Sequence, residues 1–333
     1  MKPMKKRILI LSHDNKVGDA IVATGLFHPL RTHMPDCEIG VLCGPSNAAL
    51  YKHHPDVKWL HVSASRNVFA RMWASFKARL VGYDMVVHFG LDLANPSQQI
   101  VLNMVNAKQR FLFAKHPVNP LPNDVVIDGV TEQSHYSERH IRFLRAMNIA
   151  INSYRYDIRF EEQAPSLKVE RAGPLLVINS QSSTANRSLS LAWLYDFVST
   201  VRAQHPTMAI QLLSASPSHQ ADLTQTMADL DDHVSVSPFH PSVSHSLKVI
   251  STADVVLTPD TYAVHAASAW NIPVVALYLP SGPTKVWTPL SDTYVQIEAA
   301  PGKMVSDISI SDAMKALNEV MTSPHLQRHV HAN

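Results

Sequence analysis

The feature that most constrains the fold is an alternation of short apolar runs with segments of helical periodicity. An uninterrupted apolar run is typical of a strand buried on both faces, as in parallel sheets covered by helices. Helical segments between such strands indicate right-handed crossovers and therefore an α/β fold. The first series predicts strands at Arg7–Leu11, Glu38–Leu42, Val57–Val62, Met85–Phe89 and Gln109–Phe113.

The same alternation restarts in the second half of the chain. Periodicity fades and charge rises around residues 154–172, which we interpret as a linker. Beyond it, apolar runs predict strands at Leu175–Asn179, Met208–Leu213, around Val234, and at Val255–Leu257 and Val274–Leu277. A chain of 333 residues with 46% apolar residues suits two domains. We therefore predict two doubly wound Rossmann-like domains, residues 1–160 and 173–333, that face each other.

Composition excludes several classes of protein. A net charge of +2 excludes a strongly basic nucleic-acid binder. The two cysteines, Cys37 and Cys43, are too few for a disulfide framework and lack a metal-binding spacing. No stretch reaches 18 apolar residues, and the apolar run Ile8–Leu11 is too short for a signal peptide. We therefore expect a cytoplasmic protein.

The first loop with candidate chemistry follows the first predicted strand. Gly18 can adopt backbone conformations closed to other residues and lets a ligand approach the main chain. Asp19 follows at the expected start of a helix, where the helix dipole stabilises a carboxylate. The residues alone leave two roles open for Asp19, a helix cap and a catalytic group. Asp14 is a rival carboxylate in the same loop.

The second loop, Asn179–Val198, combines hydroxyl groups with a guanidinium ahead of a helix. Such a set suits an anionic phosphate, although a solvated loop with a surface arginine is the alternative. Its candidate residues are Ser182, Ser183, Thr184 and Arg187.

The third loop, Leu257–Pro289, places Asp260 and Thr261 at a helix N-terminus, with His265 one turn further on. Backbone amides there can hold a phosphate, and Asp260 can hold a sugar hydroxyl. The alternatives are simple helix caps and a histidine satisfied within the core. Trp287 either lines this site or packs.

These segments together resemble glycosyltransferase family 9, the ADP-heptose lipopolysaccharide heptosyltransferases. The similarity extends over most of the chain and includes the helix in His135–Ile149. Three motifs carry it, namely Gly18-Asp19, the degenerate Arg187-Ser188-Leu189-Ser190, and the run Asp260 to His265 followed by Pro273-Val274-Val275-Ala276-Leu277.

The resemblance implies a GT-B architecture, with the nucleotide-sugar on the C-terminal domain and a lipid-linked acceptor on the N-terminal domain across a cleft. It implies a bacterial, inverting, metal-independent transferase with Asp19 as general base and no cofactor. The expected donor is ADP-L-glycero-D-manno-heptose, and the acceptor a lipopolysaccharide core or related surface glycan, with no nucleic acid involved. Arg187 stands where the family has lysine. The implied donor-binding residues are Ser182, Ser183, Arg187, Asp260, Thr261, Tyr262 and His265.

The sequence departs from the family pattern at several positions. Tyr262 replaces a glycine and could crowd the diphosphate. Further departures are Leu189 for Trp, Ser190 for Pro, Asn179-Ser180-Gln181 for Asn-Pro-Gly, and Gly25 for a common Pro. Two other functions therefore stay open, a nucleotide-sugar-binding protein with weakened catalysis and a nucleotide-sugar epimerase.

The acceptor side rests on the segment SRNVFARMWASFKARL, in which basic and aromatic residues alternate. Such a helix can contact phosphorylated sugar and anionic lipid, or it can be an ordinary amphipathic helix with a solvated face. We assign Gly18, Arg66 and Arg71 to acceptor binding, and expect peripheral contact with the cytoplasmic face of the inner membrane.

Overall fold

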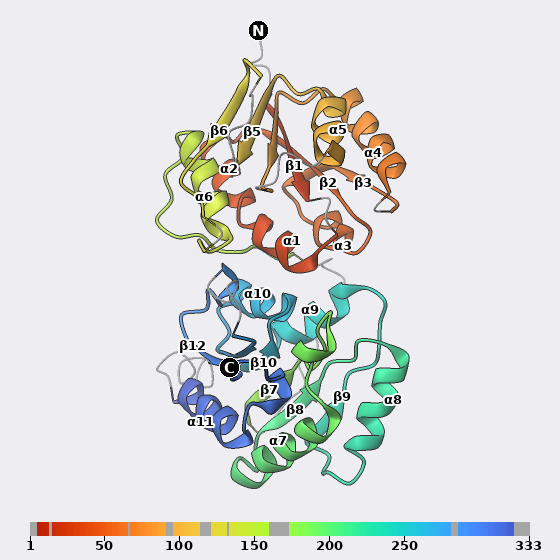
Figure 1. Cartoon of the computed structure of the whole chain (residues 1–333), viewed down its shortest axis with the longest axis vertical. Coiled ribbons are helices and arrows are strands. Elements are labelled where there is room, and N and C mark those ends of the chain that lie inside the picture. Colours follow the sequence, from red (N-terminus) through yellow and green to blue (C-terminus); the bar gives the residue numbers. More distant parts are fainter. Residues whose placement is uncertain are drawn as a thin grey trace. The chain divides into compact units, whose positions relative to one another are not determined.

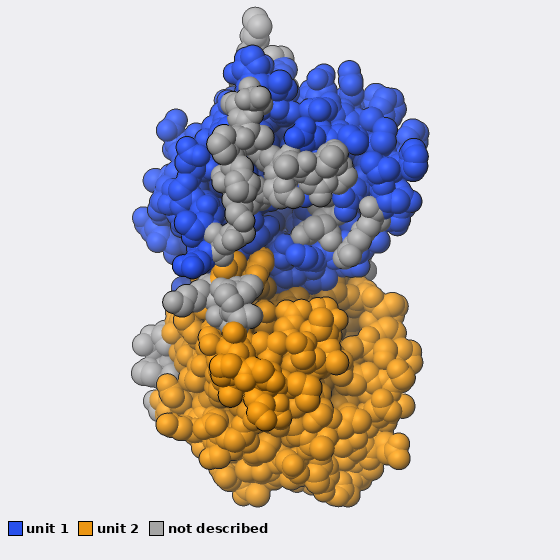
Figure 2. Space-filling view, viewed as in Figure 1, with its two compact units in different colours: residues 1–162 blue, residues 163–333 orange. Residues whose placement is uncertain are grey.

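The computed structural model describes residues 5–12, 15–65, 67–90, 96–113, 121–131, 133–159, 173–280 and 286–322. The chain divides into two compact units, Met1–Glu162 and Gln163–Asn333 (Figure 2).

The described part of unit 1 contains a six-stranded parallel sheet in the order β3-β2-β1-β4-β5-β6 (Figure 1). This order places β1 in the middle, as in doubly wound dinucleotide-binding folds. The strands are β1 (Arg7–Ser12), β2 (Glu38–Cys43), β3 (Val57–Val62), β4 (Met85–His88), β5 (Gln109–Phe113) and β6 (Asp124–Ile127).

Helices cover both faces of this sheet. Leu9 and Leu11 pack with residues of α4 and α5, whereas Ile8 and Ile10, equally buried, point to the opposite face. This two-sided burial explains the unbroken apolar sequence of β1. The helices are α1 (Val17–Thr24), α2 (Phe27–His33), α3 (Ala48–Lys52), α4 (Val68–Val81), α5 (Pro96–Val105) and α6 (Ser137–Ala146).

Unit 2 repeats the plan, with strand order β12-β11-β10-β7-β8-β9 among its described residues. Its strands are β7 (Leu175–Ile178), β8 (Ala209–Leu212), β9 (Val234–Val236), β10 (Val255–Pro259), β11 (Val274–Tyr278) and β12 (Tyr294–Glu298). Its helices are η1 (Ala185–Arg187), α7 (Leu191–Gln204), α8 (Pro217–Thr226), α9 (Val243–Ser251), α10 (Tyr262–Ala269), η3 (Val305–Asp307) and α11 (Ile310–Met321). The α7 and α11 helices share one core with the sheet, in which Phe197, Leu257 and Leu317 are fully buried.

The structure differs from the sequence prediction at two strands. The β6 and β12 strands were not predicted, because both lie at a sheet edge and most of their residues are only partly buried. An edge strand does not need the continuous apolar run by which the inner strands were recognised.

The helix expected to start at Asp19 begins at Val17 and ends at its C-cap, Gly25, and α2 follows from Phe27. A Cβ on Gly25 would lie 2.6 Å from the ring of Tyr154. Tyr154 donates a hydrogen bond to the Val22 carbonyl at 2.7 Å, and the Asp157 amide donates to Thr24 at 2.9 Å. Part of the stretch assigned to the linker, residues 154–158, therefore belongs to unit 1 and packs against α1. Residues 160–172 lie outside the described residues.

Candidate functional site

Asp19 lies in the first turn of α1, close behind the carboxyl end of β1. Lys16 occupies the N-cap position and makes no side-chain cap hydrogen bond. Asp19 is thus not the N-cap residue, although its place in the first turn still suits the helix dipole. Gly18 is helical, and the described glycines with positive φ are Gly82, Gly129 and Gly302. The expectation that Gly18 uses a backbone conformation closed to other residues is therefore wrong.

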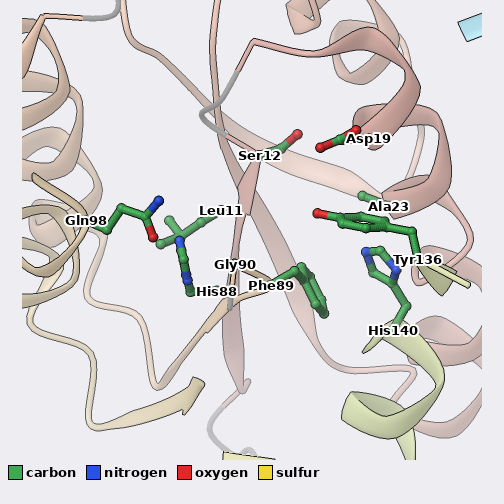
Figure 3. A pocket seen from close by; sticks show the side chains of 10 residues that line it. All are labelled: Leu11, Ser12, Asp19, Ala23, His88, Phe89, Gly90, Gln98, Tyr136 and His140. Carbon is green, nitrogen blue, oxygen red and sulfur yellow. The ribbon is translucent and has the colours of Figure 1, made fainter. Parts of the chain in front are cut away.

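A cavity of about 90 Å³ opens beside Asp19 in unit 1. Figure 3 shows Ser12 and Asp19 on one side of it, with Gln98 and Tyr136 reaching in from opposite sides. The wall comes from β1, α1, α5, the end of β4 and the start of α6. Its lining residues are Leu11, Ser12, Asp19, Ala23, His88, Phe89, Gly90, Gln98, Tyr136 and His140. A hydroxyl-bearing ligand would find both acceptors and donors here.

Gly90 keeps this cavity in shape. A Cβ on Gly90 would lie 2.5 Å from the His88 ring and 3.3 Å from Oε1 of Gln98. That Gln98 oxygen is buried and has no hydrogen-bond partner among the described residues. A buried carbonyl oxygen without a partner is costly unless a ligand or water satisfies it. The cavity therefore has the character of a polar binding site.

The histidine at the base of the cavity is neutral. His140 lies in an aromatic cluster, 4.1 Å from the Phe89 ring centroid and 5.7 Å from that of Tyr154. Burial lowers the pKa of His140 from 6.5 to about 3, and the charges of Arg139 and His135 add to this effect. At neutral pH this imidazole therefore carries no charge.

We expect acid to destabilise unit 1 through His140. The unfolded state takes up the proton first as the pH falls, because its pKa is near 6.5 and the folded value is about 3. The contribution of this group to stability is complete above the unfolded pKa and is lost progressively towards pH 3. At pH 4 the loss is about 3 kcal/mol. Urea unfolding of the wild type and of His140→Phe at pH 7 and pH 4 measures it. Between pH 7 and pH 4, the free energy of unfolding of the variant should fall by about 3 kcal/mol less than that of the wild type. Equal falls in the two proteins would contradict the low pKa of His140.

Sequence reasoning missed His88, Gln98 and Tyr136 as site residues. His88 ends a strand, and Tyr136 lies in the HYSERH segment, so both carried a positional signal. Gln98 gave no such signal, because it lies on α5, and only the folded structure shows that this helix borders the cavity. Arg71 lies on α4 and is not among the residues that line the cavity. Arg66 and Asp14 lie outside the described residues.

In unit 2 an asparagine joins the loops that follow β7 and β10. The amide nitrogen of Asn179 donates to Oγ1 of Thr261 at 2.9 Å and to Oγ1 of Thr258 at 3.1 Å. The same nitrogen lies 3.2 Å from the Gln181 carbonyl. This network fixes the start of the loop predicted to bind phosphate against the N-terminus of α10.

Arg187 brings the second and third predicted loops together. Its Nη1 lies 3.2 Å from the carboxylate of Asp260, 73 residues away. Its Nη2 donates to Ser183 at 2.6 Å and its Nε to Thr184 at 3.1 Å. Arg187 is thus not an unattached surface side chain. It remains partly exposed, so an anion can still reach it.

Asp260 is the carboxylate of this cluster. Burial raises the pKa of Asp260, and the nearby Arg187 opposes that rise. Thr261 caps α10, because its hydroxyl accepts from the Ala263 amide at 3.2 Å. The capping alternative therefore applies to Thr261 and not to Asp260. Ser182 joins the cluster through its backbone amide, which donates to Ser188 at 3.0 Å.

Tyr262 and His265 both lie on α10. The Tyr262 hydroxyl is hydrogen-bonded to Ser246 of α9, and burial raises its pKa. The side chain that replaces the family glycine is thus held against a neighbouring helix. His265 is buried. Its ring and that of Trp287 meet in an edge-to-face arrangement, with their centroids 5.5 Å apart. Of the two roles expected for Trp287, the structure shows packing, on the ring of His265.

Within the described ranges, no group of three or more His, Cys, Asp or Glu side chains is placed to hold a metal ion. Over the same ranges, no helix is long and apolar enough to cross a membrane.

Comparison with known proteins assigns one part of the chain to a family. The model of glycosyltransferase family 9 (heptosyltransferase) matches residues 152–316. No curated protein matches the chain in sequence. Among solved structures, E. coli heptosyltransferase WaaC with ADP matches with a TM-score of 0.76 and 16% identity, covering 94% of this chain and 99% of that one.

Two other solved structures match equally broadly. The family 9 glycosyltransferase from Veillonella parvula gives a TM-score of 0.79 at 15% identity, over 96% of this chain and 98% of that one. E. coli ADP-heptose lps heptosyltransferase II gives 0.71 at 16% identity, over 97% and 99%. The two parallel sheets therefore form the GT-B fold of heptosyltransferases, and residues 152–316 form a glycosyltransferase family 9 domain.

Proposed function

We propose that this protein is an inverting heptosyltransferase that moves heptose from ADP-L-glycero-D-manno-heptose to a lipopolysaccharide core or related surface glycan. The observation that carries the proposal is the Asp19 carboxylate in the wall of a polar cavity. The family 9 domain supports sugar transfer, and the matched structures of E. coli WaaC contain ADP or an ADP-heptose analogue.

In the proposed reaction the acceptor sugar occupies the cavity of unit 1. Asp19 takes the proton from the attacking hydroxyl while the acceptor oxygen forms a bond to the anomeric carbon. The bond from that carbon to the ADP oxygen breaks, and the pair of electrons leaves with ADP. A single displacement inverts the anomeric centre. General-base assistance of this kind contributes about 10²–10⁴-fold to the rate.

Donor binding falls to the cluster in unit 2. Arg187 balances the growing charge on the diphosphate, assisted by the hydroxyls of Ser182 and Ser183. The N-terminus of α10, from Thr261 and Tyr262 to His265, provides amides and a dipole for the same anion. Asp260 contacts the ribose. Since a guanidinium and a helix dipole supply the positive potential, we propose a reaction without a metal or cofactor.

The proposed acceptor is lipid-linked. We therefore propose that the protein is cytoplasmic and acts at the cytoplasmic face of the inner membrane. A nucleic-acid partner has no support in the net charge of +2.

A nucleotide-sugar screen by thermal unfolding tests the donor. ADP-heptose at 100 times its dissociation constant should stabilise the protein by about 2.7 kcal/mol, because it binds only the native state. ADP-glucose and UDP-linked sugars serve as controls for the sugar and the base. A larger shift with a UDP-sugar than with ADP-heptose would contradict the proposed donor.

Tyr262 favours a second function, binding of the nucleotide-sugar with weakened transfer. A bulky residue follows the Thr261 cap where the family has glycine. Calorimetric binding of ADP-heptose without turnover on a panel of acceptors would support this alternative. A kcat within the range typical of enzymes, about 1–10³ s⁻¹, would exclude it.

A further inference from the structure

The α4 helix carries its largest apolar side chains on the outside. Phe69, Trp73, Phe76 and Leu80 are 77%, 61%, 42% and 72% exposed. Their spacing of four, three and four residues places them in one stripe along the helix. The opposite face, which contains Ala74, Ser75 and Ala78, is buried.

This arrangement reverses the usual pattern of a surface helix, in which large apolar residues face the core. Small residues line the buried side, where α4 packs beside α5 (Figure 1) and against the core of unit 1. The stripe therefore adds nothing to that core. The rings of Trp73 and Phe76 stack on each other, 5.9 Å apart. Contiguous exposed apolar surface of this kind marks an interaction site.

The charges beside the stripe have one sign. Lys77 and Arg79, both exposed, lie about 80° to either side of the stripe at 100° per residue. The Lys77 ammonium lies 5.4 Å from the Trp73 ring centroid. The segment Val68–Val81 contains no acidic residue. Cations along both borders of an aromatic stripe complement an anionic surface.

We propose that this face of α4 binds the surface of an anionic lipid bilayer, with the aromatic rings at the level of the acyl boundary and the cations among the headgroups. A second copy of the chain would place equal charges opposite each other, which opposes self-association. The inference concerns binding alone and goes beyond the proposed transfer reaction, so its test requires no sugar substrate.

Vesicle sedimentation tests the proposal with the full chain. The wild type should bind vesicles of phosphatidylcholine with 30% phosphatidylglycerol, and should bind phosphatidylcholine alone at least tenfold more weakly. Raising the salt concentration should release it. Lys77→Ser/Arg79→Ser should weaken binding roughly 25-fold, since each cation near the surface contributes about fivefold. Phe69→Ser/Trp73→Ser should weaken it at least tenfold.

Matched variants separate this site from general surface effects. Leu121→Ser removes an exposed apolar residue elsewhere in unit 1, and Lys303→Ser/Lys315→Ser removes two exposed cations from unit 2. Both should bind as the wild type does. Since the substituted α4 side chains are exposed, thermal unfolding should show every variant folded.

Tryptophan fluorescence tests the same contact without the serine double variants. Doxyl-labelled lipid should quench tryptophan fluorescence in the wild type, and quenching should be smaller in Trp73→Phe, which keeps an aromatic ring. Absence of binding to anionic vesicles, or equal losses in the matched variants, would overturn the proposal. So would a dimer that Phe69→Ser/Trp73→Ser dissociates, because a second copy would then be the occupant.

Discussion

Replacing Asp19 with asparagine should lower kcat for sugar transfer by about 10²–10⁴-fold, the range expected for loss of a general base. Asparagine keeps the size of the side chain but cannot accept the proton of the attacking hydroxyl. Asp19 lines the cavity of unit 1, whereas the proposed donor cluster belongs to unit 2. The affinity for ADP-heptose, measured by calorimetry, should therefore stay within about twofold, well below the tenfold change that corresponds to 1.4 kcal/mol.

Asp14→Asn is the matched control, because Asp14 is the rival carboxylate of the same loop. Its kcat should remain close to that of the wild type. Turnover of Asp19→Asn near the wild-type level with a proven acceptor would refute the assignment of the base. A collapse in Asp14→Asn alone would transfer the role to Asp14.

Arg187→Ala should lower kcat/KM by about 10²–10³-fold, the cost of removing one group that stabilises transition-state charge. The guanidinium holds Asp260 and Ser183 in the ground state and is proposed to meet the diphosphate as the bond to the sugar breaks. Its removal also leaves Asp260 buried without its cation. The pKa of Asp260, already raised by burial, should rise further.

Two variants sharpen this result. Arg187→Lys keeps the charge and loses the fork of donors, so it should recover only part of the activity. Ser183→Ala removes one partner of Arg187 and leaves the cation, so its effect should be small, within about fivefold. If Arg187→Ala reduced donor affinity and left kcat unchanged, Arg187 would serve ground-state binding and not leaving-group stabilisation.

Much of the fold could be predicted because inner parallel strands leave a strong trace in sequence. Arg7–Leu11 and Val274–Leu277 read as continuous apolar runs, since helices cover both faces of the sheet. The residues of the edge strand β12 are all exposed or only partly buried, so this strand left no such trace. The need for glycine at position 25 was hidden because the ring of Tyr154, which fills the space beside it, comes from more than a hundred residues away.

The sequence by itself determined the class of fold, the resemblance to family 9 and the loops in which Asp19, Arg187 and Asp260 lie. The class of fold and the loops follow from local periodicity and from the rule that ligands meet the carboxyl ends of parallel strands. The resemblance rests on the three motifs. Only the tertiary structure decided the partners, such as Arg187 with Asp260, or Asp19 with the cavity lined by Gln98. It also decided that Trp73 faces outward. Contacts between distant segments depend on strand order and helix packing, which residue spacing along the chain does not record.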